Sequence, residues 1–335
     1  MKQVLITGGT GSFGKAFLEE ILDSGYSLER VVVYSRDELK QWEIQQRFPV
    51  NKYPQLRLFL GDVRDKERLM QAMQGIDTVI HAAALKQVPA AEYNPLEFIK
   101  TNVLGTENVV QACLANNVKN AVALSTDKAA APVNLYGATK LCADKLFIAA
   151  NNIKGKRDIK FSVVRYGNVM GSRGSVTPFF LNQARNGSFI SVTDERMTRF
   201  NISLKQGVKM VLWALRNQIG KELFVPKIPS YNILELAKAI APSLQTQVIG
   251  IRPGEKIHEE MITVSDSPTT VDIGDYYAIL PPGDNFELQT YIDVWKARLV
   301  PENFSYSSGS NPHFLNAEQL RDLIRENVDP NFQPI

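Results

Sequence analysis

Short apolar runs of strand length alternate with longer amphipathic segments through the first half of the chain. The strand-like runs are residues 3–7, 30–34, 56–60, 77–82, 120–125 and 161–167. Segments between them, such as 14–24, 66–75 and 95–117, repeat their apolar residues at helical spacing. Apolar strands that alternate with amphipathic helices indicate a parallel sheet that is covered by helices on both faces.

This regular alternation ends after Gly167. Helical patterns follow at 205–218 and 233–244, with the short apolar run 222–226 between them. Near the C-terminus, Asn316 is predicted to cap a last helix, "AEQLRDLIREN", because an Asn side chain can accept hydrogen bonds from the first backbone N–H groups of a helix.

We therefore predict an α/β protein with two domains. A doubly wound parallel sheet is expected in residues 1–167, and residues 205–230 are expected to return to it. A smaller, mixed α/β domain is expected in residues 168–204 and 231–335.

The composition gives little reason to expect an unusual partner. Hydrophobic residues make up 44% of the 335 and charged residues 22%, and the net charge of +3 is too small to indicate nucleic acid or a membrane. The two cysteines, Cys113 and Cys142, lie in apolar, helix-like runs, which argues against a disulfide framework. No signal peptide, long apolar segment or metal-ligand spacing is evident, so we expect a cytoplasmic protein without a metal site.

The first apolar run leads into a glycine-rich turn, "TGGTGSFGKAF", with GxxGxxG spacing. Glycines allow a tight turn and let backbone N–H groups approach a pyrophosphate at a helix N-terminus. Because the turn joins a buried strand to an amphipathic helix, it predicts a Rossmann-type dinucleotide site. The residues assigned to this part of the site are Gly8, Thr10, Gly11, Ser12, Phe13 and Gly14.

The end of the second apolar run bears on the choice between NAD and NADP. An NAD site usually has Asp or Glu there, which binds the ribose 2′-hydroxyl. Here Ser35 and Arg36 come first, and their hydroxyl and guanidinium groups suit a 2′-phosphate. We therefore predict NADP. In the alternative, Arg36 is only a solvated loop residue and Asp37 binds the ribose.

Two further strand ends contribute to the predicted cofactor site. "GDVRD" places Asp62 and Val63 where adenine can be held by a hydrogen bond and an apolar contact, although Asp62 could equally cap the next helix. "HAAALK" supplies Ala82 and Ala83, small residues that suit a close approach of the cofactor to the backbone. His81 in the same run is expected to be structural.

Candidate catalytic residues gather in "LSTDKAAAPVNLYGATK". Tyr136 and Lys140 are four residues apart, so they share one face of a helix. Tyr has an ordinary pKa of ~10 and is a poor base at neutral pH, but a nearby ammonium group lowers that pKa. Lys140 can also hold the nicotinamide ribose. Asp127 and Lys128 place an acid beside an amine at the end of a strand, where the alternative is a surface ion pair.

Together these motifs resemble the extended short-chain dehydrogenase/reductase family over most of the chain. The matching stretches are "TGGTGSFG", "GDVRD", "HAAALK", "LSTDKAA", "YGATK", "RYGNVMGSRGSV" and "RPGEKIHE". The last two are similar to motifs of enzymes that act on nucleotide sugars. "YSRDELKQ" and "STDKAA" narrow the resemblance to inverting UDP-N-acetylglucosamine 4,6-dehydratases, lyases that begin pseudaminic acid synthesis.

The resemblance implies a role for each residue of the catalytic stretch. Tyr136 takes the proton of the sugar 4-hydroxyl as hydride leaves C4 for NADP, and Thr126 donates a hydrogen bond to the 4-oxygen. Lys128 then takes the C5 proton, and Asp127 protonates the departing 6-hydroxyl. Lys128 must be partly neutral for this, so its pKa is expected to be lowered by burial or by Lys140. Retaining relatives carry Asp-Glu where this chain has Asp127-Lys128.

The resemblance also implies how the smaller domain binds the sugar nucleotide. In relatives, arginines in the later motifs bind the diphosphate and a glutamate binds the ribose hydroxyls, and Asn102 is expected to border the site. The substrate-binding residues implied in this way are Lys86, Asn168, Arg173, Thr193, Arg199, Arg252 and Glu255.

The relatives pair through the helices that correspond to 95–117 and 136–152, and this group tends to form hexamers. A homo-oligomer with both cysteines shielded is therefore expected. Two other functions stay open. A nucleotide-sugar 4-epimerase shares Tyr136 and Lys140 but needs no acid–base pair for C5 and C6. A non-catalytic NADP-binding regulatory protein would need neither.

Overall fold

The computed structural model describes residues 1–172, 174–281 and 285–335. Its main feature is a ten-stranded sheet. From edge to edge the strands are β16 (Arg298–Leu299), β14 (Thr270–Asp272), β15 (Tyr276–Ile279), β10 (Leu223–Pro226), β6 (Lys160–Tyr166), β5 (Asn120–Thr126), β4 (Thr78–His81), β1 (Gln3–Thr7), β2 (Arg30–Ser35) and β3 (Leu56–Leu60). The part of the sheet from β10 to β3 is parallel, as the alternating pattern predicts.

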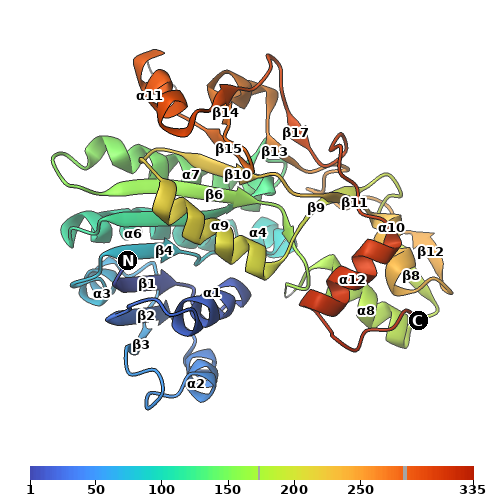
Figure 1. Cartoon of the computed structure of the whole chain (residues 1–335). Helices are drawn as coiled ribbons and strands as arrows, with labels where there is room; N and C mark the ends of the chain where they lie inside the picture. Colours follow the sequence, from blue (N-terminus) through green and yellow to red (C-terminus); the bar gives the residue numbers. More distant parts are fainter. Residues whose placement is uncertain (173, 282–284) are drawn as a thin grey trace.

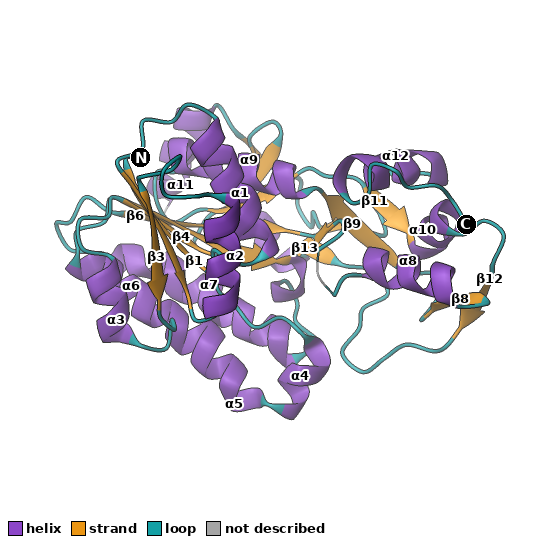
Figure 2. Cartoon of the chain, turned by 90° about the horizontal axis from the view of Figure 1, so that it is seen from below, coloured by secondary structure: helices purple, strands orange, loops and turns teal. Residues whose placement is uncertain are grey.

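The central strands are apolar throughout because helices cover both faces of the sheet. Val31, Val32 and Val33 are all fully buried, so successive side chains on opposite faces both lie in the core. Helices α1 (Ser12–Asp23) and α9 (Leu204–Asn217) pack together on one face, and α3, α6 and α7 lie on the other (Figures 1 and 2). The predicted fold class, a Rossmann-type doubly wound sheet with further mixed α/β structure, is confirmed.

The remaining helices of this part connect the strands. They are α2 (Glu38–Arg47), α3 (Lys66–Ala72), α4 (Val88–Tyr93), α5 (Pro95–Phe98), the π-helix η1 (Ile99–Leu104), α6 (Gly105–Ala115), the 3₁₀ turn η2 (Asp127–Ala129), α7 (Leu135–Ile153), the 3₁₀ helix η3 (Val264–Thr269) and α11 (Asn285–Trp295). Among the described residues, no helix combines the length and apolar character that a membrane crossing requires.

A smaller lobe has an apolar cluster of its own (Figure 1). Its elements are α8 (Val176–Asn186), β8 (Phe189–Val192), α10 (Ile233–Ile240), β12 (Gln245–Val248) and α12 (Ala317–Asn327). Asn316 caps α12, with its side chain accepting from the Gln319 N–H, as the sequence predicts. Short strands lie between the lobe and the sheet: β7 (Asn168–Val169), β9 (Thr198–Ile202), β11 (Ser230–Asn232), β13 (Glu260–Ile262) and β17 (Tyr306–Ser307).

One part of the chain lies elsewhere than expected. Residues 231–335 were assigned to the smaller domain, whereas β14, β15 and β16 extend the main sheet in antiparallel fashion beyond β10. These strands are only two to four residues long, and such short runs carry too little periodicity to indicate their partner. The domain division therefore stays a proposal.

The cysteines differ in their surroundings. Cys113 is fully buried and contacts the sulfur of Met73, whereas Cys142 is exposed on α7. Cys113 is thus shielded by its own chain, and only Cys142 would report on an interface.

The turn before β10 contains a buried carboxyl group, that of Glu222. Its Oε1 accepts hydrogen bonds from the backbone N–H groups of Ile219 (2.6 Å) and Gly220 (2.7 Å). Burial outweighs these hydrogen bonds and raises the pKa of Glu222 from 4.5 to about 7.

This raised pKa predicts a pH-dependent loss of stability. Because the folded-state pKa lies above the unfolded one, the stability from Glu222 is fully present below pH 4.5 and is lost as the pH rises to 7. At ~1.4 kcal/mol per pKa unit, the loss is on the order of 3 kcal/mol. Glu222→Gln keeps the acceptor oxygen and should remove the pH-dependent part. Urea unfolding between pH 4.5 and 8 measures it, with Glu195→Gln at an exposed turn as control. Parallel curves for wild type and Glu222→Gln would contradict this assignment.

Candidate active site

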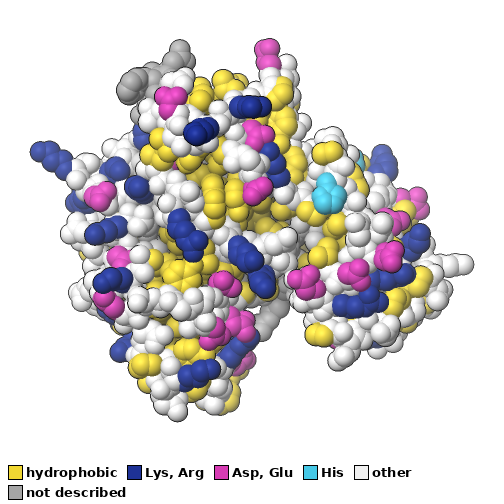
Figure 3. Space-filling view, viewed as in Figure 1, with side chains coloured by type: hydrophobic (Ala, Val, Ile, Leu, Met, Phe, Trp, Pro, Cys, Tyr) yellow, Lys and Arg dark blue, Asp and Glu magenta, His cyan; other side chains and the backbone are white. Residues whose placement is uncertain are grey.

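A cleft of about 640 Å³ opens at the carboxyl ends of the parallel strands. It is one of the hollows visible between the sheet-bearing part and the smaller lobe in the space-filling view (Figure 3). All predicted catalytic and cofactor residues line it: Gly8, Thr10, Gly11, Ser12, Phe13, Gly14, Ser35, Arg36, Asp62, Val63, Ala82, Ala83, Lys86, Thr126, Asp127, Lys128, Tyr136 and Lys140.

The glycine-rich turn forms a tight cradle at the start of α1. Gly8 has a φ of +67°, and a Cβ there would lie 2.8 Å from the Cα of Ala83. At Gly14, a Cβ would lie 2.3 Å from the backbone oxygen of Gly9. The N-cap of α1 is Gly11, which has no side chain to satisfy the first N–H groups of the helix. The cradle therefore suits an anion such as a pyrophosphate.

The residues after β2 have separate tasks. Asp37 is the N-cap of α2 and accepts a hydrogen bond from the Lys40 N–H at 3.0 Å. Arg36 is half exposed and lies 3.5 Å from Asp62. Because Asp37 is already engaged as a cap, the arrangement favours the prediction that Arg36 binds a 2′-phosphate.

Asp62 does not cap α3, which removes one of its two sequence interpretations. The N-cap of α3 is Asp65. Asp62 instead accepts hydrogen bonds from the Arg64 backbone N–H (3.0 Å) and from the Arg64 guanidinium (2.7 Å). Because Asp62 lines the cleft, its contact with adenine stays a prediction.

Asn102 and His81 do not line the cleft but lie next to segments that do. The Asn102 side chain accepts from the Leu85 N–H at 2.8 Å and donates to the Leu85 carbonyl at 2.9 Å, which holds the segment that carries Lys86. His81 is fully enclosed between Thr7 and Thr106, and burial lowers its pKa to about 3. Its predicted structural role agrees with these contacts.

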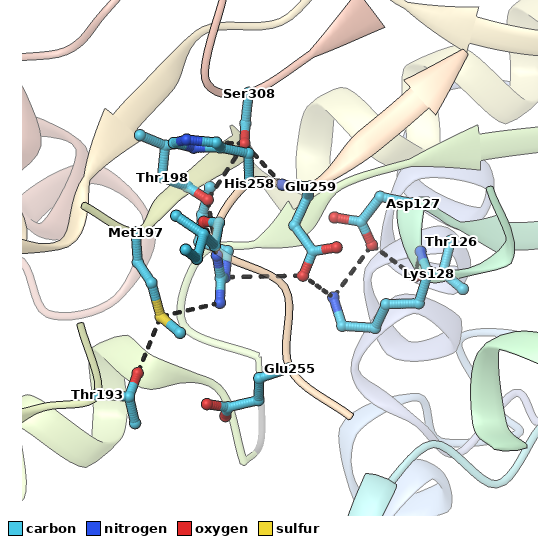
Figure 4. Close-up of polar contacts among 12 residues, drawn as sticks. Thr126, Asp127, Lys128, Thr193, Met197, Thr198, Glu255, His258, Glu259 and Ser308 are labelled. Atoms are coloured by element: carbon cyan, nitrogen blue, oxygen red, sulfur yellow. Dashed lines mark hydrogen bonds and ion pairs between the residues drawn. The ribbon is translucent and has the colours of Figure 1, made fainter. Parts of the chain in front are cut away.

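The end of β5 brings the acid–amine pair into a buried position (Figure 4). The ammonium Nζ of Lys128 lies 3.1 Å from Asp127 Oδ1 and 3.1 Å from Glu259 Oε1. Thr126 donates a hydrogen bond to Asp127 Oδ1 at 2.8 Å. Asp127 is fully buried, so the alternative of a surface ion pair is wrong.

Sequence reasoning missed Glu259. It lies in the quoted motif "RPGEKIHE", but only Arg252 and Glu255 of that motif were assigned. The one available signal was its membership of the motif, because its approach to Lys128 depends on how β13 packs near η2. Glu259 is also 3.7 Å from Arg199.

The pKa of Lys128 is shifted opposite to the expectation. Burial alone lowers the pKa of the ammonium group, but Asp127 and Glu259 outweigh burial and raise it well above its ordinary value. Burial raises the pKa of Asp127, and the charge of Glu259 adds to this effect. The pair therefore favours a protonated amine beside a carboxyl group that gains protons readily.

Tyr136 also departs from the expectation. Burial raises its pKa to about 12, and the opposing ammonium is that of Lys128 rather than Lys140. Lys140 donates to the Leu124 carbonyl at 2.8 Å, and burial lowers its pKa against the opposing charge of Asp144. The lysine whose charge favours the phenolate form of Tyr136 is thus Lys128, and not Lys140 as the helix spacing suggested.

The predicted substrate residues are only partly brought together. Lys86 and Asn168 line the cleft, and Arg173 lies outside the described residues. The others do not line it. Arg199 donates to the backbone oxygens of Thr198 and Ile257, and Thr193 contacts Met197.

Arg252 and Glu255 form a 3.5 Å ion pair with each other on a turn near the start of α7. Asn134 connects the two regions by donating to the Gly254 carbonyl at 2.8 Å. The nucleotide contacts of Arg252 and Glu255 stay a prediction.

The cleft also contains polar residues that sequence reasoning did not assign. Gln87, Tyr166 and Ser175 line it, and Asn168 Oδ1 and Ser175 Oγ are buried without a hydrogen-bond partner among the described residues. Tyr166 and Ser175 lie within the quoted motif "RYGNVMGSRGSV" and Gln87 directly follows "HAAALK", and these motifs were the available signal. The part of the chain that the structure describes contains no cluster of His, Cys, Asp and Glu able to hold a metal ion.

Comparison with known proteins adds the following findings. A family model described as polysaccharide biosynthesis protein matches residues 4–281. A UDP-N-acetylglucosamine 4,6-dehydratase (inverting) from Campylobacter jejuni is 53% identical over 328 residues, which cover 96% of this chain and 97% of the relative. A UDP-glucose 4-epimerase from Rickettsia canadensis is 40% identical over 329 residues, which cover 96% of this chain and 95% of the relative. The X-ray structure of Pen from Bacillus thuringiensis is 37% identical, with a TM-score of 0.86 and 97% of each chain covered.

The position of Arg36 predicts a preference for NADP. Arg36→Ala should weaken NADP binding roughly 10- to 100-fold, as expected from losing ~1.5–3 kcal/mol of charge-assisted hydrogen bonding. NAD binding should change little, because NAD has no 2′-phosphate. Calorimetric titration measures both. Arg64→Ala is a matched control, since Arg64 pairs with the same Asp62 but does not line the cleft. Equal losses for NAD and NADP would exclude a phosphate contact.

Proposed function

The chain belongs to the family of polysaccharide biosynthesis proteins, and we propose that it is an NADP-dependent UDP-N-acetylglucosamine 4,6-dehydratase that inverts C5. The product is then UDP-2-acetamido-2,6-dideoxy-beta-L-arabino-hexos-4-ulose, the first intermediate of pseudaminic acid synthesis. The resemblance drawn from the sequence motifs is confirmed by the 53% identity to an inverting dehydratase. The observation that carries the proposal is the buried Asp127–Lys128 pair beside Tyr136 in the cleft.

The residues of the cleft fit a nicotinamide dinucleotide. The glycine cradle and the uncapped start of α1 accept the pyrophosphate, and Arg36 binds the 2′-phosphate. Tyr136 and Lys140 hold the nicotinamide ribose at the end of β5. When bound, the nicotinamide takes a hydride from C4 of the sugar and later returns it to C6.

Tyr136 is the base for the first step. Its pKa of about 12 means that the hydroxyl is protonated at neutral pH. Tyr136 must therefore first release its hydroxyl proton to solvent, and the nearby Lys128 charge stabilises the resulting phenolate, which then takes the proton of the sugar 4-hydroxyl. Thr126, whose hydroxyl donates to Asp127 Oδ1 in the structure, redirects this hydrogen bond to the 4-oxygen when the sugar binds.

The Asp127–Lys128 pair performs the elimination. The new 4-ketone acidifies the C5 proton, which moves to neutral Lys128. The C6–O bond then breaks, and the departing hydroxyl takes a proton from Asp127 to leave as water. Asp127 Oδ2 has no hydrogen-bond partner among the described residues, so this oxygen is available to the substrate. C5 then takes a proton from solvent on the opposite face as the cofactor's hydride is returned to C6, and Tyr136 releases the proton of the 4-hydroxyl to solvent before the next cycle, so the protons balance.

A second candidate is a 4-epimerase, because a relative with 40% identity carries that description. An epimerase needs only the oxidation and reduction at C4, for which Tyr136 and the cofactor suffice. It has no use for a buried acid–amine pair, so the pair favours the dehydratase. We also propose a homo-oligomer, since the described faces of α5, η1 and α7 expose Leu96, Leu104 and Ile153.

The wild-type protein should release water from UDP-N-acetylglucosamine and place deuterium at C5 when the reaction runs in D₂O. Mass spectrometry detects the loss of water, and NMR of the earliest product reads the configuration at C5. An epimerase would give no loss of water, and a binding protein would give no reaction. L-arabino product supports inversion, whereas retention at C5 in early product would leave a retaining dehydratase with an unusual lysine.

Two substitutions should separate oxidation from elimination. Tyr136→Phe should nearly abolish the whole reaction, because no other base for the 4-hydroxyl is evident among the described residues. Lys128→Ala should still permit oxidation at C4, so absorbance at the NADPH band should rise without release of water. NADP titration and thermal unfolding of each variant check that the site is intact. Release of water by Lys128→Ala at the wild-type rate would remove Lys128 from the mechanism.

A further inference from the structure

Glu259 is held rigidly although it lies outside the cleft. Its backbone N–H donates to Ser308 Oγ at 2.9 Å, and its carbonyl accepts from the Ser308 N–H at 2.8 Å. Ser308 is fully buried and also contacts the hydroxyl of Thr198 at 2.7 Å. Only 4% of the Glu259 side chain is exposed. Its carboxylate therefore has a fixed position relative to η2.

The carboxylates of Glu259 and Asp127 share one ammonium group. Figure 4 shows Lys128 Nζ between the two carboxylates, and Arg199 Nε lies 3.7 Å from the same Glu259 oxygen, Oε1, that Lys128 contacts. Both N–O distances are 3.1 Å. Asp127 and Lys128 line the cleft and Glu259 does not, so Glu259 reaches the substrate only through Lys128.

The elimination requires a protonation state that this resting cluster does not favour. The base must be neutral Lys128 and the acid must be protonated Asp127. The short Nζ–Oδ1 contact provides a route, because transfer of one proton from the Lys128 ammonium to Asp127 converts the ion pair into that state. Lys128 then takes the C5 proton, and Asp127 passes its proton to the leaving hydroxyl. After one cycle Lys128 is again an ammonium group and Asp127 a carboxylate, so the protons balance.

We propose that Glu259 is a positioning residue for this pair: it fixes the Lys128 amine beside Asp127, and its charge sets the pH window in which the pair holds one shared proton. The inference rests on the proposed function, because only a C5 elimination needs an amine and an acid together. The active state exists while the pair holds a single proton. A bell-shaped profile follows, and its two limbs belong to the pair rather than to either residue.

The negative charge of Glu259 shifts both limbs in one direction. It favours the ammonium form of Lys128 and disfavours the carboxylate form of Asp127, so it raises the pKa of both groups. Removing the charge should move both limbs to lower pH. Other ionisable groups that face Lys128 are Arg199, Tyr136, Lys86, Lys256 and Tyr231. They remain in place in a Glu259 variant, so the shift reports Glu259 itself.

The test is the pH profile of water loss from UDP-N-acetylglucosamine for wild type and Glu259→Gln. We expect the acidic limb of the Glu259→Gln profile to lie about one pH unit or more below that of wild type. At a pH below the wild-type limb, the rate of the variant as a fraction of its own plateau rate should then be about tenfold higher than the same fraction for wild type. The alkaline limb should move in the same direction. KM should stay near the wild-type value, because Glu259 does not line the cleft.

Two further variants keep the result decisive. Glu260→Gln, at the next residue of the chain, is the matched control and should leave both limbs at the wild-type pH. Glu259→Asp keeps the negative charge but draws it back from Lys128 and Arg199, which both contact Oε1 of Glu259, so it should shift the limbs in the same direction by less. If Glu259→Gln does not fold, as thermal unfolding and NADP titration would reveal, Glu259→Asp decides.

Each outcome separates this inference from the proposed function. Limbs that stay at the wild-type pH while only the height of the profile falls would show a merely structural Glu259 and overturn the inference alone. A wild-type protein that releases no water from the substrate would overturn the proposed function, and this inference with it.

Discussion

Partial burial of Lys128, whose side chain is 26% exposed, is the constraint on which the rest of the site depends. Removing such an ion from water costs several kcal/mol unless counter-charges lie close to it. Asp127 supplies one of them from the adjacent position, and Glu259 supplies the other from a segment 131 residues further along the chain. Glu259 is in turn anchored to Ser308 and paired with Arg199, on strands that join the smaller lobe to the sheet. The free-energy cost of burying one ammonium group thus favours the packing of segments that are distant in the sequence.

The sequence could predict features that depend on neighbours along the chain. The sheet follows from apolar runs alternating with amphipathic helices, and the glycine turn and the cap of α12 follow from local chemistry. Tyr136 and Lys140 lie together because of helix spacing. The sign of the Lys128 and Tyr136 pKa shifts could not be predicted in this way, because both depend on contacts across the fold. Glu259 was missed for the same reason.

The cofactor side of the cleft shows a similar division of tasks among acidic residues. Asp37, Asp62 and Asp65 follow two adjacent strands, and the sequence alone leaves Asp62 with two possible roles, an adenine contact or a helix cap. The structure uses Asp37 and Asp65 as helix caps and pairs Asp62 with Arg64. Arg36 lies 3.5 Å from Asp62. The predicted site of the ribose 2′-position therefore has a cation beside its carboxylate. The proposed preference for NADP therefore rests on the whole group and not on Arg36 alone.

Tyr136 lies between two clusters of charged residues. In the proposed mechanism, their separation explains how one site can perform the proton transfers of both the oxidation and the elimination. On one side, Asp144 accepts from Ser125 at 2.7 Å and from Arg165 at 3.1 Å, and its charge favours the ammonium form of Lys140. On the other side, the Lys128 ammonium group lies between the carboxylates of Asp127 and Glu259. The first cluster keeps a fixed cation near the ribose, whereas the second must change its protonation state during elimination. Lys140 also donates to the Leu124 carbonyl at 2.8 Å, which anchors its Nζ on the Asp144 side of the site. The position of each lysine thus follows from the partners that burial requires.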